Sequence, residues 1–221
     1  DVLEALGVRI DLGPDAVAEC VREVGVGFMF APLHHSALRH AAPARKQLGF
    51  RTILNLLGPM TNPAGATHQL IGVFDASRVR TVAEVLARLG SKRALVVHGC
   101  DGLDEITLAG PTTAALLADG VVRDLTLDPA NHGVPRATAE ALAGGDKNTN
   151  AGIVRDVLGG STGPASDIVR VNAGAALWVG ELADSFAEGL ELATRILHSG
   201  AALEKLEALA AHSQRLGGDP R

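Results

Sequence analysis

Two kinds of apolar pattern alternate along this chain of 221 residues. Helix-type spacing, in which apolar residues recur at intervals of three and four, occurs at Val17, Cys20, Val21 and Val24 and again at Val82, Val85, Leu86 and Leu89. Continuous apolar runs bounded by turn residues, typical of strands buried on both faces, occupy residues 69–74 and 93–97. This alternation predicts an α/β fold with a mainly parallel central sheet flanked by helices, and both runs are expected in mid-sheet.

The second half of the chain carries different signals. Asp119-Gly120 lies between two apolar runs and predicts an antiparallel hairpin within residues 112–127. From about residue 137 the chain is rich in Ala, Leu and Glu, which indicates a helical C-terminus, and Ser185 with Glu188 has the spacing of a capping box. The segment GGDKNTNAG (144–152) indicates a loop or helix cap, with a phosphate-binding loop as the alternative. We expect one large domain over residues 1–221, with or without a small lobe.

Composition argues against several classes of protein. The chain has 20 Lys and Arg against 25 Asp and Glu, a formal charge of −5, so bulk attraction to polyanions is not expected. Aromatic residues make up 3% of the chain, too few for a platform on which nucleic-acid bases could stack. Two cysteines without metal-ligand spacing, and no apolar run near the roughly 18 residues of a membrane span, favour a cytoplasmic protein that binds neither nucleic acid nor membrane.

An acidic pair follows one of the predicted strands. Asp104 and Glu105 lie in the sequence VVHGCDGLDEIT, which leaves the apolar run at 93–97. Because ligands of parallel sheets bind outside the carboxyl ends of the strands, this loop is expected at the mouth of a site. Neighbouring carboxylates there suit Mg²⁺, which proteins hold through one or two carboxylates together with substrate phosphates. The alternative is a polar turn.

A basic segment, APLHHSALRHAAPARKQLGFRT (31–52), contains three His and three Arg. If Ser36 caps a helix that runs to about Leu48, Arg45 lies on the same face as Leu38. An arginine beside apolar surface suits the carboxylate of a flat organic ligand, because its planar guanidinium binds carboxylates through two hydrogen bonds. A solvated basic helix face is the alternative, and the histidines lack the partners expected of a metal site.

Turn residues interrupt the apolar stretch NLLGPMTNPAG (55–65). Gly58-Pro59 is expected to break regular structure there and to present backbone in a fixed shape that could form the wall of a flat ligand site. The chain contains no glycine-rich nucleotide-binding loop of the P-loop or dinucleotide type and no nucleophile elbow.

Four segments, taken in order, resemble the anthranilate phosphoribosyltransferase family. They are DVLEALGVRIDLGP, FMFAPLHHSALRHAAPARKQLGFRTILNLLGPMTNPAG, HGCDGLDEIT and VNAGAALWVGELADSFAEGLELA. The resemblance covers essentially the whole chain. It implies the large domain of the nucleoside phosphorylase and phosphoribosyltransferase type. It also implies transfer of phosphoribose from 5-phosphoribosyl pyrophosphate to the amino group of anthranilate, with Mg²⁺ and loss of pyrophosphate.

The resemblance also assigns residues, and no covalent nucleophile is among them. Arg45 would face the anthranilate carboxylate, and Asp104 and Glu105 would hold Mg²⁺ against the pyrophosphate. The residues implied to line the anthranilate site are His35, Ala31, Pro32, Leu38, Gly58 and Pro59. This chain departs from the family at Ser36, where a proline commonly follows the histidine.

Two family motifs are absent from these 221 residues: the GTGGD loop and the KHGNR segment, which bind the phosphoribosyl donor and part of the anthranilate. The resemblance therefore implies a C-terminal part without the N-terminal helical domain through which the family forms homodimers. Such a part is expected to be inactive alone. The alternatives are an enzyme like pyrimidine nucleoside phosphorylase, a non-enzymatic paralogue that binds nucleic acid, and a fragment with only a structural or interaction role.

Overall fold

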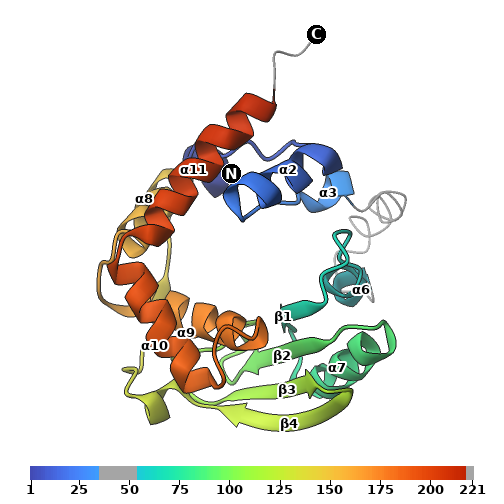
Figure 1. The fold of residues 1–221 in the computed structure, drawn as a ribbon. Helices are drawn as coiled ribbons and strands as arrows, with labels where there is room; N and C mark the ends of the chain where they lie inside the picture. Colours follow the sequence, from blue (N-terminus) through green and yellow to red (C-terminus); the bar gives the residue numbers. More distant parts are fainter. Residues whose placement is uncertain (35–53, 218–221) are drawn as a thin grey trace, which may run out of the picture. The chain divides into compact units, whose positions relative to one another are not determined.

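The computed structural model describes residues 1–34 and 54–217 and divides the chain into two compact units (Figure 1). The first unit comprises Asp1–Leu54, Gly144–Gly160 and Leu197–Arg221, and the second comprises Asn55–Ala143 and Ser161–Ile196. Each unit therefore combines segments that are far apart in the sequence. In the part of the chain that is described, no helix has both the length and the apolar character needed to cross a membrane.

Helices form the first unit. Its elements are α1 (Val2–Ala5), α2 (Pro14–Val24), α3 (Ala31–His34), α8 (Lys147–Leu158) and α11 (Ala201–Leu216). Helix α2 begins with Pro14, whose missing N–H costs nothing in the first turn, and ends at Gly25 in the left-handed region at φ 88°. The core of the unit joins this helix to α8 and α11, through Val17, Cys20, Val24, Ala151, Leu206 and Leu209.

Helix α2 confirms the predicted spacing except at one residue. Val17, Cys20 and Val24 are buried, whereas Val21 is 51% exposed and lies beside the buried stripe rather than within it.

The segment 144–152 contains the predicted helix cap, at the start of α8. The Asp146 side chain accepts hydrogen bonds from the Asn148 and Thr149 N–H groups at 3.0 and 2.8 Å.

A four-stranded sheet organises the second unit. The strands are β1 (His68–Gly72), β2 (Arg93–Gly99), β3 (Thr112–Ala118) and β4 (Val121–Leu127), in that spatial order. The β1–β2 pairing is parallel, and the β2–β3 and β3–β4 pairings are antiparallel. The predicted α/β fold is confirmed, but the described sheet is mixed rather than mainly parallel. Strand β2 is internal as expected, whereas β1 is at one edge of the described sheet.

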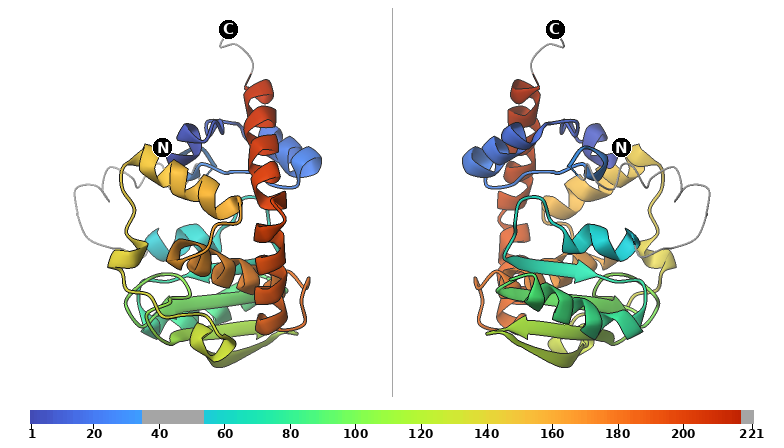
Figure 2. Two further views of the ribbon diagram at one scale, coloured as in Figure 1. Left: turned by 90° about the vertical axis from the view of Figure 1, so that its left-hand side faces the viewer. Right: turned by 90° about the vertical axis from the view of Figure 1, so that its right-hand side faces the viewer.

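Helices cover both faces of this sheet (Figure 2). Helix α7 (Val79–Arg88), which follows the short η1 helix (Ala76–Arg78), packs on one face against Ala94 and Val96. Helices α9 (Pro164–Val179) and α10 (Phe186–His198) supply the core on the other face, against Leu95 and Val97. Strand β2 is therefore apolar at consecutive positions because successive side chains enter different cores. The remaining short elements are α6 (Leu54–Met60), η2 (Pro129–His132) and η3 (Glu140–Leu142).

The predicted hairpin is present, and the capping box is present with its return hydrogen bond shifted from Ser185 to Asp184. Asp119 and Gly120 connect β3 to β4 with φ values of 53° and 74°, the positive pair that a tight two-residue hairpin requires. Ahead of α10, the Ser185 hydroxyl accepts a hydrogen bond from the Glu188 N–H at 3.2 Å. The Glu188 carboxylate accepts one from the Asp184 N–H at 2.9 Å.

The predicted break at Gly58-Pro59 is wrong in position. Both residues lie inside α6, and the helix continues to Met60. The chain leaves the helix at the next residue, where the N–H and hydroxyl of Thr61 both donate to the Leu57 carbonyl, at 3.1 and 2.9 Å. Pro59 leaves the carbonyl four residues earlier without its N–H partner, and the turn forms at 62–65, where the Gly65 N–H donates to the Asn62 carbonyl at 3.0 Å.

Candidate functional site

The acidic pair lies in the loop that leaves β2, at the edge of the sheet where two parallel strands end. Gly72, the last residue of β1, is paired with Val97 of β2. A Cβ atom on Gly72 would overlap the backbone carbonyl of Asp104, so the loop packs directly on the end of β1. The structure therefore confirms that Asp104 and Glu105 lie at the carboxyl ends of the parallel strands, which is where open α/β sheets bind ligands.

The loop backbone is fixed by its own hydrogen bonds. The Gly99 N–H donates to the Leu103 carbonyl at 2.8 Å, and the Gly102 N–H donates to the Gly99 carbonyl at 2.9 Å. Gly102 has φ 92°, a conformation that side chains rarely allow. The loop closes on the segment that follows, because the buried Thr107 donates from its hydroxyl to the Asp101 carboxylate at 2.7 Å.

Helix α9 holds the residue that follows the acidic pair. The Asn172 side-chain oxygen accepts a hydrogen bond from the Ile106 N–H at 2.9 Å, and its amide nitrogen donates to the Ile106 carbonyl at 3.0 Å. The same nitrogen donates to the Ile168 carbonyl, one turn earlier in the helix, also at 3.0 Å. One side chain thus satisfies both backbone groups of the residue next to Glu105.

These supporting residues were not predicted from the sequence, although two signals were available. Asn172 lies in the interior of an apolar helical segment, where asparagine is a poor helix former and its position calls for a partner. Gly72 ends a strand at a point where a close backbone approach is a common reason for glycine.

The electrostatics of the pair favour a cation. Asp104 and Glu105 are both exposed, and partial desolvation together with the neighbouring Asp104 charge raises the pKa of the Glu105 carboxyl. Within residues 1–34 and 54–217, neither carboxylate forms an ion pair with Lys, Arg or His. Two adjacent carboxylates with no cationic partner among the described residues are suited to a hard divalent ion.

The carboxylates of Asp104 and Glu105 are suited to a Mg²⁺ ion that takes most of its ligands from water and from a bound substrate. Over the described residues, no group of three or more His, Cys, Asp or Glu side chains is arranged to hold a metal. Two exposed carboxylates would leave the remaining positions of an octahedral ion to water and ligand oxygens, which is the usual arrangement for magnesium at phosphate sites. The residues present therefore fit the ion that the resemblance implies.

The predicted anthranilate-site residues are distributed over the chain. Arg45, His35 and Leu38 lie outside the described residues. Ala31 and Pro32 form the start of α3 in the first unit, and both are exposed. Gly58 and Pro59 belong to α6 in the second unit. That these residues assemble into one site stays a prediction.

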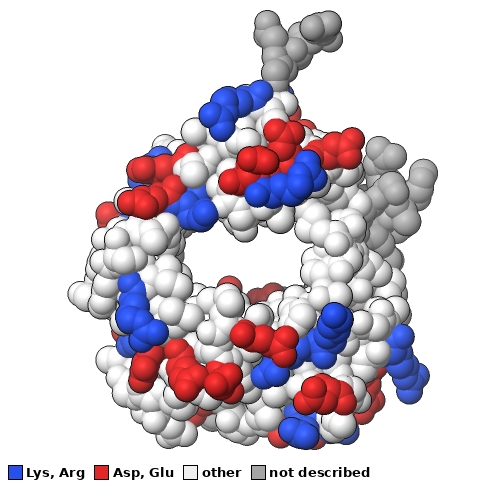
Figure 3. Space-filling view, viewed as in Figure 1, with Lys and Arg blue, Asp and Glu red and all other residues white. Residues whose placement is uncertain are grey.

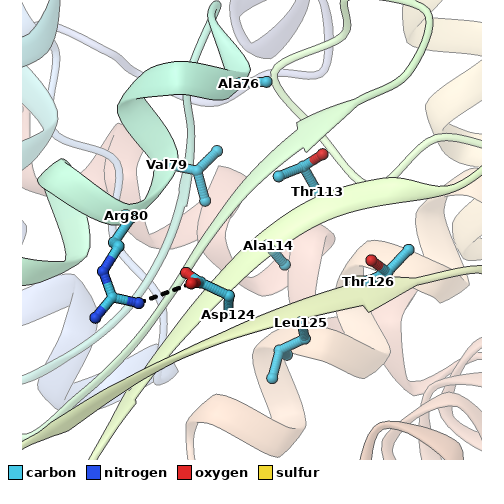
Figure 4. Close-up of a pocket in the computed structure, with 8 residues that line it drawn as sticks. All are labelled: Ala76, Val79, Arg80, Thr113, Ala114, Asp124, Leu125 and Thr126. Atoms are coloured by element: carbon cyan, nitrogen blue, oxygen red, sulfur yellow. Dashed lines mark hydrogen bonds and ion pairs between the residues drawn. The ribbon is translucent and has the colours of Figure 1, made fainter.

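A surface groove of about 390 Å³ lies between α7 and the β3–β4 hairpin (Figure 4). None of the predicted site residues lines it. Its charged groups already have partners within the unit: Arg80 donates to Asp124 at 2.7 Å and to Glu84 at 2.9 Å. The groove is thus distinct from the acidic loop and offers no unpaired charge to a ligand.

Charged side chains of both signs are interspersed over the face shown in Figure 3. On that face the described residues form no continuous basic area of the kind that tracks a nucleic-acid backbone. This distribution agrees with the formal charge of −5.

Comparison with known proteins adds the decisive observation. Residues 1–203 match the family described as "Glycosyl transferase family, a/b domain". The chain belongs to this family. The family match includes the acidic loop, its supporting strands and helix α9, so the site described above is part of the glycosyl transferase domain.

Individual glycosyl transferase relatives are similar over nearly all of this chain. The anthranilate phosphoribosyltransferase of Rubrobacter xylanophilus is 52% identical over 219 residues, covering 99% of this chain and 64% of its own. The crystal structure of anthranilate phosphoribosyltransferase (TrpD) from Thermus thermophilus matches with a TM-score of 0.90 and 43% identity, over 96% of this chain and 63% of that one.

A more distant relative was solved with ligands. The Saccharomyces cerevisiae anthranilate phosphoribosyltransferase in complex with PRPP and Mg matches with a TM-score of 0.88 and 25% identity. That match covers 97% of this chain and 62% of the yeast chain. The present chain thus spans less than two thirds of the length of these relatives.

Proposed function

We propose that this glycosyl transferase domain serves the transfer of phosphoribose from 5-phosphoribosyl pyrophosphate to the amino group of anthranilate, which releases pyrophosphate. The observation that carries the proposal is the acidic loop at the carboxyl ends of β1 and β2. There Asp104 and Glu105 have no cationic partner among the described residues. The relatives named above, which are anthranilate phosphoribosyltransferases, support it.

Asp104 and Glu105 are proposed to hold Mg²⁺ at this edge. When bound, the ion would supply positive charge to the leaving pyrophosphate, which a protein of formal charge −5 does not supply in bulk. The two carboxylates bind and orient, and no proton transfer by either of them is required. Their loop is rigidly held, and such pre-organisation lets electrostatic stabilisation act without reorganisation during the reaction.

The acceptor part of the site is proposed around Arg45. Its guanidinium would bind the anthranilate carboxylate through two hydrogen bonds and direct the amine toward C1 of the ribose. His35, Ala31, Pro32 and Leu38 would line the site, with Gly58 and Pro59 as apolar wall. Catalysis then rests on positioning and on charge stabilisation, without a covalent intermediate.

We extend the proposal to the assembly and the location of the enzyme. The 221 residues contain neither the GTGGD nor the KHGNR motif, so this chain by itself is proposed not to catalyse transfer. Turnover by the chain alone would contradict that statement. The enzyme is proposed to be cytoplasmic and to act as a homodimer, with anthranilate and 5-phosphoribosyl pyrophosphate as its partners.

Titration calorimetry of anthranilate, with Mg²⁺ and pyrophosphate present, tests the acceptor site. We expect saturable binding that Arg45→Ala weakens by about 2–4 kcal/mol, because the ligand carboxylate then loses a bidentate partner. Arg123→Ala, which removes an exposed arginine on β4, is the matched control and should bind as the unmodified chain does. Equal affinity in the two variants would contradict the assignment, whereas no binding by the unmodified chain would mean that the acceptor site needs the absent KHGNR segment.

A further inference from the structure

Asn172 is the side chain through which helix α9 reaches the acidic loop. Its three hydrogen bonds, at 2.9, 3.0 and 3.0 Å, connect the N–H and carbonyl of Ile106 to the helix backbone at Ile168. We propose that Asn172 is a positioning residue, which holds the Glu105 carboxylate in the orientation that binds the metal. The inference rests on the proposed function, because it gives Asn172 its role at the same metal site.

The anchor lies where the chain passes from exposed loop to buried core. Asp104 and Glu105 are exposed, whereas Ile106, Thr107 and Leu108 are fully buried. A carboxylate on a loop binds a metal well only if its backbone is fixed within a fraction of an ångström. The bonds to Ile106 fix the peptide groups on either side of that residue, and one of these groups is the peptide that joins it to Glu105.

Asparagine is well matched to this task. The side-chain amide presents an acceptor and two donors at a fixed separation, which allows it to bond both backbone groups of one residue. Aspartate has the same shape but, when ionised, has no donor for the Ile106 and Ile168 carbonyls. Helix α9 is itself firmly held, because Val171, Ala175 and Val179 are buried in the core of the second unit.

Besides Asn172, the Thr107 N–H donates to the Thr112 hydroxyl on β3 at 3.1 Å, which holds the peptide after Ile106 but not the peptide that joins Ile106 to Glu105. Gly72 permits the close approach of the Asp104 backbone but, as a glycine, has no side chain with which to bond the loop. The hydrogen bond between Asp101 and Thr107 connects two residues of the same loop region. Asn172 is 66 positions away from Ile106 in the sequence and ties the loop to a separate helix. Loss of this tie should therefore free the acidic pair without unfolding the unit.

Three variants separate positioning from stability: Asn172→Ala, the isosteric Asn172→Asp, and Ser166→Ala as the control. Ser166 is buried on the same helix and donates from its hydroxyl to the Ser161 carbonyl at 2.6 Å, away from the acidic loop. The readouts are the affinity for Mn²⁺ in the presence of pyrophosphate by electron paramagnetic resonance, the hydrogen-exchange rate of the Ile106 amide, and Tm.

We expect Asn172→Ala to lower Mn²⁺ affinity by about 10- to 100-fold, as loss of a group that orients metal ligands generally does. Exchange of the Ile106 amide should accelerate in that variant. Asn172→Asp keeps the acceptor for the Ile106 N–H, so its Mn²⁺ affinity should lie between those of the unmodified chain and Asn172→Ala. This variant also provides a measurement if the alanine variant folds poorly. Ser166→Ala should lower Tm while leaving Mn²⁺ affinity and Ile106 exchange unchanged.

Glu105→Gln serves as the reference for the metal site. If it weakens Mn²⁺ binding while both Asn172 variants bind normally, the positioning role is overturned and the proposed metal site stands. If Glu105→Gln leaves binding unchanged, the metal site of the proposed function fails, and the positioning role fails with it. If Ser166→Ala weakens binding as much as Asn172→Ala does, the effect is one of general stability and the positioning role is likewise overturned.

Discussion

Glu105 illustrates how local surroundings give a surface carboxylate its chemical character. The residue is exposed, yet partial desolvation and the adjacent Asp104 charge raise the pKa of its carboxyl. The loop backbone is held on both flanks of the pair, because Asp104 packs closely on Gly72 and Asn172 bonds to Ile106, the residue after Glu105. The repulsion is therefore held in place, and a bound cation would relieve it.

Asp128 provides a contrasting carboxylate whose pKa moves in the opposite direction. The Arg136 guanidinium bonds to it at 2.6 Å and lowers the pKa of the Asp128 carboxyl. A carboxyl with a lowered pKa in the folded state contributes stability that is present above its ordinary pKa. That contribution is lost as pH falls through the lowered value. Arg136→Gln should thus reduce the free energy of unfolding near neutral pH, and the difference should vanish in acid.

Urea unfolding at a series of pH values, followed by the fluorescence of Trp178 in the same unit, measures this difference. Arg123→Gln is the matched control, since it removes an exposed arginine from β4 and should give no pH-dependent difference. A loss of stability in Arg136→Gln that is equally large at pH 3 and at pH 7 would contradict the assignment of the pair.

Helices α9 and α10 approach closely at a pair of glycines. A Cβ atom on Gly174 would lie 2.7 Å from the Leu190 nitrogen, and one on Gly189 would overlap the Gly174 carbonyl. The contact brings Phe186 and Leu190 of α10 into the same core as Val171 and Ala175 of α9. Glycine at this crossing therefore sets the separation of the two helices that cover one face of the sheet.

Gly174→Ala should destabilise the second unit by about 1–3 kcal/mol, because the added methyl group forces two backbones apart. Urea denaturation measures the change. Ala176→Leu adds more bulk on the exposed side of the same helix and should change the free energy of unfolding by no more than about 0.5 kcal/mol. Equal effects of the two substitutions would argue against a close crossing at Gly174.

The sequence predicted those helices, strands and turns that depend on the spacing of apolar residues or on the turn residues between them. The helices at 14–24 and 79–88, the strands around 69–74 and 93–97, and the hairpin at Asp119-Gly120 all follow from spacing or turn chemistry. The number of parallel strands and the edge position of β1 do not, because strand order depends on pairings between distant segments. The break expected at Gly58-Pro59 was misplaced, because both residues lie inside α6 and the helix ends at Met60.

The candidate site shows the same division. The position of Asp104 and Glu105 at a strand end could be predicted, because a loop that leaves a parallel strand must lie at its carboxyl end. Their support by Asn172 could not, since the partner of a lone helical asparagine depends on how α9 packs. Arg45 stays a prediction, because it lies outside the described residues.

Over the whole molecule, the glycosyl transferase family match and the acidic loop point to the same function. The family match covers residues 1–203, and the relatives named above are anthranilate phosphoribosyltransferases of which this chain spans 62–64%. Sequence similarity identifies the family, and the structure shows that Asp104 and Glu105 lie at the carboxyl ends of β1 and β2. We propose that these carboxylates, Asp104 and Glu105, receive the magnesium that accompanies pyrophosphate.

Calorimetric titration of Mg²⁺ into the chain in the presence of pyrophosphate tests whether Asp104 and Glu105 bind the ion. The chain is compared with a double variant, Asp104→Asn with Glu105→Gln, which keeps the shape of both side chains and removes their charge. We expect saturable binding by the unmodified chain and a loss of about tenfold or more in the double variant, whose Tm should be no lower because the repulsion between the two carboxylates is removed. Equal Mg²⁺ affinity in the two proteins would show that Asp104 and Glu105 are not the magnesium ligands.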